Sequence, residues 1–176
     1  MDLHEFDMQY YGEYPLLCGM DEAGRGPLAG DVFAAAVILA PDTVIEGIND
    51  SKKLTEKKRE RLYDIIKEKA LSYGIAYGTV EEIESVNILG ATFLAMNRAI
   101  ASLETKPDFA LIDGNRAPKG ITIPCETVVK GDGKAMSIAA ASVLAKVTRD
   151  RLMLEYDKTY PQYNFKKHKG YGTREH

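Results

Sequence analysis

The chain has 176 residues, a length that fits one domain with a full hydrophobic core. Hydrophobic residues make up 45% and charged residues 28%, and no apolar run approaches the roughly 18 residues that a membrane span requires. The acidic N-terminus, with Asp2, Glu5 and Asp7, does not fit a signal or transit peptide, so we expect a cytoplasmic location and no membrane partner. The two cysteines, Cys18 and Cys125, form no CxxC pair and predict two buried thiols rather than a metal or redox pair.

The net charge of −3 gives no overall basic footprint for a nucleic-acid partner, but the charge is unevenly distributed. Residues 146–176 carry eight Lys or Arg and four acids, a local net charge of +4, with tyrosines and a histidine between them. A second basic run lies at 52–61, and a solvated helix face explains it adequately. The C-terminal run is less easily explained in that way.

The first half of the chain predicts three strands and a helix. Apolar segments at 16–20 and 31–39, separated by a turn rich in Gly and Pro, predict two strands joined by a loop. Residues 55–70 are charged, with apolar residues at helical spacing, and predict a helix. Residues 73–80 predict the third strand.

The second half predicts two more helices and two more strands. Thr79 and Glu82 have the spacing of a capping box, which starts a helix whose apolar face comprises Leu89, Phe93, Met96, Ile100 and Leu103. A short buried strand is expected at 109–112, another strand at 121–129, and a long helix with a face of small residues at 135–156. Strands that alternate with helices predict an α/β fold, and the early hairpin-like pair makes its sheet mixed.

Acidic residues end or follow three of these predicted strands. Asp21 and Glu22 end the first strand, Asp113 follows the strand at 109–112, and Asp132 lies between glycines after the strand at 121–129. Each acid by itself also fits an ordinary turn or strand end, although functional sites in α/β sheets gather at such ends. Successive strand residues point to opposite faces, so Asp21 and Glu22 can serve one site only if the strand breaks at Glu22. The glycine-rich turn that follows is expected to provide that break.

If these four acids converge, they form an all-oxygen site, which suits Mg²⁺ or Mn²⁺ rather than zinc. The carboxylates would repel one another without cations. Two metal ions about 4 Å apart could activate a water and stabilise the leaving oxygen of a phosphodiester. The sequence shows no His/Cys set with zinc spacing, no supported Ser-His-Asp pattern and no Walker spacing.

Five motifs in order resemble bacterial ribonuclease HII, over nearly the whole chain from about Leu16. They are MDEAGRGPLAG at 20–30, NDSKKL at 49–54, LIDGN at 111–115, SIAAASVLAKVTRD at 137–150 and HKGYGT at 168–173. The resemblance implies one catalytic domain over 1–176, with a ribonuclease H-like mixed β-sheet flanked by helices. It also implies an endonuclease that hydrolyses the RNA strand of RNA–DNA hybrids and cuts 5′ to ribonucleotides embedded in duplex DNA, leaving 3′-hydroxyl and 5′-phosphate ends.

The same resemblance assigns residues to roles. The catalytic carboxylates, which hold the divalent metal, would be Asp21, Glu22, Asp113 and Asp132. The 2′-hydroxyl of the ribonucleotide, which separates RNA from DNA, would be read by Gly24, Arg25 and Gly26. Tyr171 would pack against the sugar at the RNA–DNA junction. Phosphate contacts, which position a substrate rather than specify it, would come from Lys52, Lys53, Ser142 and Lys146.

The chain is expected to act as a monomer. Asp150 belongs to a motif, but its charged neighbours predict an ion pair on a helix surface. The family usually continues for some tens of residues beyond the position of His176, so the C-terminus is expected to be shortened.

Ribonuclease HIII is the nearest competing family, disfavoured by Gly24-Arg25-Gly26 and by the lack of an extra N-terminal domain. A nucleic-acid-binding module without catalysis and a metal-dependent phosphatase are the remaining hypotheses.

Overall fold

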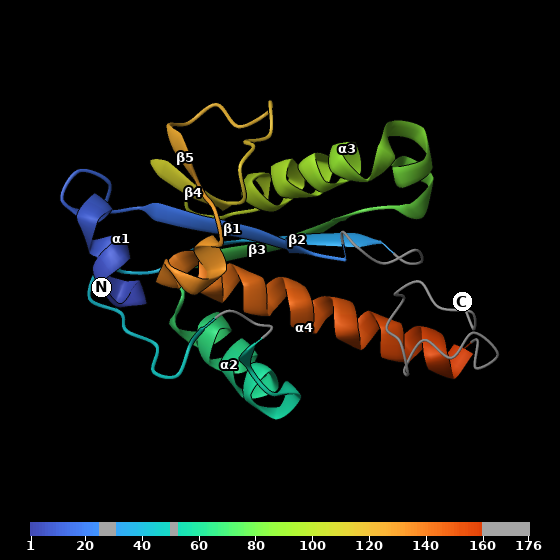
Figure 1. Cartoon of the computed structure of the whole chain (residues 1–176), viewed down its shortest axis with the longest axis horizontal. Coiled ribbons are helices and arrows are strands. Elements are labelled where there is room, and N and C mark those ends of the chain that lie inside the picture. The colour runs from blue at the N-terminus through green and yellow to red at the C-terminus, as the bar shows by residue number, and fades with distance from the viewer. Residues whose placement is uncertain (25–30, 50–52, 160–176) are drawn as a thin grey trace.

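The structure is a computed structural model that describes residues 1–24, 31–49 and 53–159 (Figure 1). The strands are β1 (Leu17–Ala23), β2 (Val32–Ile38), β3 (Ser72–Gly78), β4 (Phe109–Asp113) and β5 (Cys125–Val128). The helices are α1 (Leu3–Tyr11), α2 (Glu56–Lys69), α3 (Val80–Ala101) and α4 (Met136–Thr159), and a short 3-10 turn at Gly131–Gly133 precedes α4. No helix in the described ranges has the length and apolar character needed to cross a membrane.

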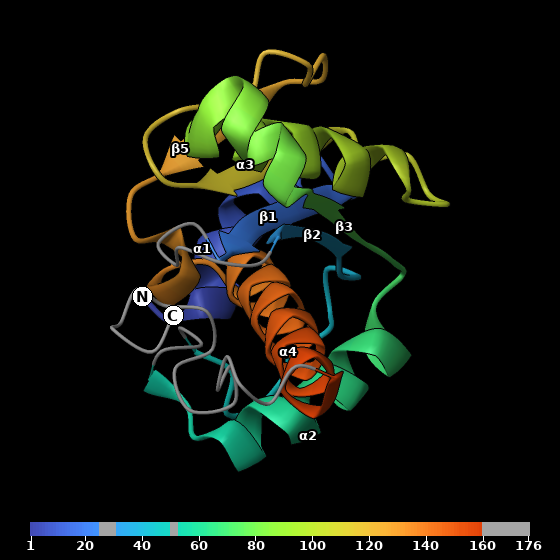
Figure 2. The same ribbon diagram turned by 90° about the vertical axis from the view of Figure 1, so that its right-hand side faces the viewer.

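The five strands form one mixed sheet in the order β3-β2-β1-β4-β5. β2 pairs antiparallel with both β1 and β3, whereas β1 and β4, and β4 and β5, pair in parallel. Helix α3 covers one face of this sheet, and α4 covers the other face with α2 packed beneath it (Figure 2). The predicted mixed α/β sheet flanked by helices is therefore confirmed.

The central strand β1 divides its side chains between the two helix layers. Cys18 and Met20 belong to the buried cluster on the α3 side, with Ala91 and Ala95 of that helix. Gly19 faces α4, where a Cβ atom would lie only 2.1 Å from the carbonyl carbon of Ser137. The backbones of β1 and α4 therefore approach each other as closely as glycine permits.

The small-residue face of α4 completes this close packing. Its buried alanines belong to the cluster that joins the sheet to α2 through Leu62 and Ile66. Side chains of this size let a helix lie near a sheet without leaving large gaps. The sequence predicted this helix at 135–156, and the structure has it at Met136–Thr159.

Three local predictions were wrong or incomplete. Helix α1 was not predicted; it is capped by Asp2 and Glu5, which form a capping box. Strand β5 covers only Cys125–Val128 because the preceding residues Ile121 and Ile123 pack against the α3 side of the core instead. Cys125 is exposed at the start of this edge strand, whereas Cys18 is buried as expected.

A buried carboxyl group joins α1 to the start of α4. Asp7 has no exposed surface, and one of its oxygens accepts a hydrogen bond of 2.8 Å from the backbone N–H of Ser137. Burial raises the pKa of Asp7 to about 7, against the lowering effect of the Ser137 hydrogen bonds and of His4. The orphan N–H groups at the helix start are a favourable partner for a carboxylate, so desolvation is what opposes its charge.

Gly19→Ala is expected to lower the free energy of unfolding by about 3 kcal/mol or more, because the new methyl group overlaps the Ser137 backbone. Chemical denaturation measures this change. Gly12→Ala is the matched control, since Gly12 has ordinary helical dihedrals and open space around it. Equal stability of the two variants would contradict the close packing of β1 on α4.

Asp7→Asn is expected to flatten the dependence of stability on pH. The folded-state pKa of Asp7 (about 7) lies above its ordinary value of 3.8, so the folded protein holds this proton more tightly than the unfolded chain. The wild type should therefore lose stability as pH rises from about 4 to 7, by roughly 1–4 kcal/mol from this group. Denaturation midpoints across this pH range measure the slope, with exposed Glu13→Gln as control. If the slope in Asp7→Asn equals that of the wild type, the raised pKa of Asp7 in the folded protein is refuted.

Candidate active site

Three of the four predicted carboxylates meet at one end of the sheet. One carboxylate oxygen from each of Asp21, Asp113 and Asp132 lies within 4.8 Å of the others. Asp21 is near the end of β1 and Asp113 ends β4, and these neighbouring parallel strands bring their carboxyl ends together. Asp21 and Asp132 are buried, and Asp113 is half-buried. The cluster therefore arises from the topology of the sheet.

The turn after β5 brings Asp132 to the other two acids. Lys130 takes a left-handed conformation (φ 55°, ψ 38°), which redirects the chain into the 3-10 turn. The backbone N–H of Asp132 donates a hydrogen bond of 3.2 Å to Oδ1 of Asp113. Helix α4 begins directly after this turn, and the N–H of Ala135 donates a hydrogen bond of 2.8 Å to the carbonyl of Gly131. Asp132 is thus held between the end of β4 and the start of α4.

The electrostatics of this cluster favour a bound cation. Burial raises the pKa of Asp21 well above its usual range, and the negative charges of Glu22, Asp113 and Asp132 raise it further. The N–H of Glu22, which donates to Oδ1 of Asp21 at 2.8 Å, lowers this pKa and only partly offsets the other effects. A cation among the carboxylates would reverse this repulsion, so the donor set fits a divalent metal that prefers oxygen ligands.

Glu22 is not one of the three clustered carboxylates, and the predicted break in the strand at Glu22 is absent. β1 continues through Ala23, with Glu22 opposite Ala34 and Ala23 opposite Phe33 in the ladder to β2. Side chains alternate along an unbroken strand, so Glu22 lies on the face opposite to that of Asp21. It is still close enough for its charge to raise the pKa of Asp21.

On its own face Glu22 lines a small cavity together with Asp113. The other lining residues come from α3 and from the segment after β4: Leu89, Thr92, Phe93, Met96, Gly114, Asn115 and Arg116. Asp113 therefore borders both the three-carboxylate cluster and the cavity of Glu22. Sequence reasoning named Leu89, Phe93 and Met96 only as the apolar face of a helix, and it did not single out Thr92 or Arg116. Only the position of Arg116 next to the motif at 111–115 could have suggested that residue.

The predicted substrate-binding residues are only partly within the described chain. Gly24 follows β1 with φ +98°, Lys53 is exposed, Ser142 is buried on α4, and Lys146 is half-buried one turn further along. Arg25, Gly26, Lys52 and Tyr171 lie outside the described residues.

Asp150 was predicted to form an ion pair on a helix surface, and the structure corrects the surface part of that prediction. Its side chain is buried. Its carboxylate oxygens lie 3.4 Å from Nζ of Lys146, 3.8 Å from the Arg59 guanidinium of α2 and 4.0 Å from that of Arg149. The packing of α2 over this turn of α4 removes Asp150 from water, and local sequence cannot show that.

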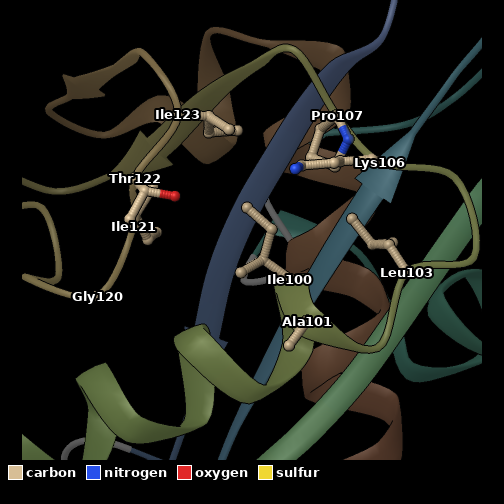
Figure 3. A pocket seen from close by; sticks show the side chains of 9 residues that line it. All are labelled: Ile100, Ala101, Leu103, Lys106, Pro107, Gly120, Ile121, Thr122 and Ile123. Carbon is tan, nitrogen blue, oxygen red and sulfur yellow. The ribbon is translucent and has the colours of Figure 1, made fainter.

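A larger groove lies away from the acids. It has a volume of about 330 Å³ and is formed by the C-terminal end of α3, the residues after it and the segment before β5 (Figure 3). Its lining is mainly apolar, with Ile100, Leu103, Ile121 and Ile123 around it and Lys106 as its charged residue. None of the clustered carboxylates contributes to it, so it is separate from the candidate active site.

Comparison with solved structures defines the class of protein. The chain is similar to ribonuclease H2 from Pyrococcus horikoshii, with 28% identity, a TM-score of 0.76, and coverage of 90% of this chain and 81% of that one. It also resembles Bst-RNase HIII, solved in complex with Mn²⁺, at 20% identity and a TM-score of 0.69, over 81% of this chain and 54% of that one. At that identity the second likeness shows the fold alone. The fold is therefore ribonuclease H-like.

Sequence comparison identifies the family within this class. The model of the family "Ribonuclease HII" matches residues 18–176. Ribonuclease HII from Endomicrobium trichonymphae is 57% identical over 177 residues, which cover 99% of this chain and 84% of that protein. The chain belongs to the ribonuclease HII family. It is therefore a hydrolase, an endoribonuclease of a family that depends on divalent metal ions and acts on RNA in RNA–DNA hybrids.

Asp21→Asn is expected to raise the melting temperature of metal-free protein by roughly 2–4 °C near neutral pH, because it removes a buried charge that its neighbours oppose. The same variant should lose most of the stabilisation that added Mn²⁺ or Mg²⁺ gives the wild type. Thermal melts in chelator and in metal measure both effects. Exposed Asp42→Asn should behave as wild type. An equal metal-induced shift in Asp21→Asn would exclude Asp21 as a ligand.

Proposed function

We propose that the chain cuts duplex DNA on the 5′ side of an embedded ribonucleotide, as well as the RNA strand of longer hybrids. The reaction is hydrolysis of a phosphodiester with two metal ions, which leaves 3′-hydroxyl and 5′-phosphate ends. The observation that carries this proposal is the meeting of Asp21, Asp113 and Asp132 within 4.8 Å in a chain of the ribonuclease HII family. All three acids come from one chain, which supports a monomer as the active unit.

In this proposal the metal ions are held by Asp21, Glu22, Asp113 and Asp132. Asp113 belongs to the carboxylate cluster and also borders the cavity that Glu22 lines, which supports a role for Glu22 beside Asp113 in holding metal. When bound, the cations supply positive charge that stabilises the negative charge developing on the phosphodiester. Mn²⁺ and Mg²⁺ both suit an all-oxygen donor set, and the Mn²⁺ complex of Bst-RNase HIII supports Mn²⁺ as one of them.

The chain after β1 is proposed to recognise the ribonucleotide. Gly24, Arg25 and Gly26 would read the 2′-hydroxyl, because the backbone of glycine can approach a ligand closely and the 2′-hydroxyl is what separates RNA from DNA. This role is supported by the place of Gly24, two residues after Glu22 at the end of β1. Tyr171 would pack against the sugar at the junction.

Phosphate groups are proposed to bind Lys52, Lys53, Ser142 and Lys146. Exposed Lys53 is available to a duplex, and half-buried Lys146 lies on the same helix as Ser142. Such contacts position the substrate and carry no sequence information, so they suit an enzyme that acts at ribonucleotides in any sequence.

A labelled DNA duplex with one ribonucleotide, incubated with Mg²⁺ or Mn²⁺, tests the proposal. The wild type should give a single cut 5′ to the ribonucleotide, with a 3′-hydroxyl end. Asp113→Asn should reduce the rate by at least about 10²–10³-fold, because a carboxylate that holds the metal is removed.

The controls separate the proposed nuclease from a binding module and from a phosphatase. Asp42→Asn should cut at the wild-type rate, and an all-DNA duplex should remain intact. Cleavage that is unchanged in Asp113→Asn would remove Asp113 from the site. Binding of the hybrid by folded wild type without a cut in either metal would favour a binding module, and hydrolysis of small phosphate esters in its place would favour a phosphatase.

A further inference from the structure

Arg149 of α4 is fully buried, which is unusual for an arginine side chain. Removal of a guanidinium from water costs several kcal/mol unless well-placed partners offset the loss. Its carboxylate neighbour Asp150, 4.0 Å away, is also approached by Arg59 and Lys146. One acid thus lies close to three cations, and Arg149 is the most deeply buried of them.

The side chain of Arg149 lies directly against the backbone where β1 ends. A Cβ atom on Gly24 would lie 2.9 Å from Nε and 3.1 Å from Cδ of Arg149, and 3.0 Å from the carbonyl oxygen of Asp31. Gly24 has φ +98°, in the region that favours glycine. Arg149 therefore contacts the backbone at Gly24, at the point where Gly24 lies close to Asp31.

We propose that Arg149 is a positioning residue for the cleavage reaction. Its planar guanidinium and the end of its stem support the backbone at Gly24, and so fix the direction in which the chain leaves β1 after Asp21 and Glu22. This inference rests on the proposed function, in which Gly24 reads the ribonucleotide. A rigid planar group suits such support better than a flexible apolar chain of similar length.

The cost of a misplaced Gly24 should appear in substrate binding more than in metal binding. Asp21, Asp113 and Asp132 are held by the strand ends and the 3-10 turn, whereas Arg149 lies against Gly24. Small displacements of a substrate-binding backbone can cost one to two orders of magnitude in activity. Loss of Arg149 should therefore raise KM and leave the metal-dependent rise in melting temperature unchanged.

Arg149→Met and Arg59→Met form a matched pair for the test. Both remove a cation that lies beside Asp150, and it is the side chain of Arg149 that lies closest to Gly24. On the duplex with one ribonucleotide, Arg149→Met should raise KM by about tenfold or more with a smaller change in kcat. Arg59→Met should leave KM close to that of the wild type. Equal effects of the two variants on KM would overturn the proposal.

Arg149→Lys keeps the inference testable if Arg149→Met does not fold. This variant retains a cation beside Asp150 but lacks the planar group, so it should keep a near-wild-type melting temperature and still raise KM. A wild-type KM in folded Arg149→Lys would refute the positioning role. If the wild type itself does not cut the duplex, the proposed function fails and this inference falls with it; a wild type that cuts, with variants of unchanged KM, overturns the positioning role alone.

Discussion

The contact between Gly19 of β1 and Ser137 of α4 sets the position of the candidate active site. A strand and a helix can approach this closely only where the strand has no side chain, and a Cβ at Gly19 would overlap the Ser137 carbonyl. Asp21 lies two residues after Gly19 on the same face of β1, and Asp132 lies five residues before Ser137. One backbone contact therefore brings together two acids that are far apart in the sequence, and β4 adds Asp113 beside them.

The two ends of this arrangement carry opposite charges. Near the start of α4, buried carboxylates oppose one another and raise the pKa of Asp21, so this end is destabilised unless a cation is bound. Further along the same helix, Asp150 faces Arg59, Lys146 and Arg149. The acidic group suits a metal, and Arg149 of the basic group lies beside the backbone that leaves β1. α4 thus connects the residues proposed for chemistry with those proposed for substrate positioning.

Much of the fold and part of the site could be predicted from the sequence because local patterns specify them. Helical spacing, the Thr79–Glu82 capping box and the small-residue face of α4 predicted three of the four α-helices in the described part of the chain. The acids after strands 16–20 and 109–112 predicted where the site would lie. The course of β1 was predicted wrongly, because the turn signal that follows Glu22 does not determine where pairing with β2 stops. Burial of Asp150 was missed because it depends on α2, which lies far away in the sequence.

The sequence by itself determined the mixed α/β class, the positions of the acids at strand ends and, through five ordered motifs, the family. These properties depend on residue type and short-range spacing, which the chain carries before it folds. Only the tertiary structure decided that Asp21, Asp113 and Asp132 form one group while Glu22 faces the other layer, and that Arg149 lies under Gly24. Strand register, the alternation of side chains and the close approach of α4 to β1 fix those relations, and each depends on residues distant in sequence.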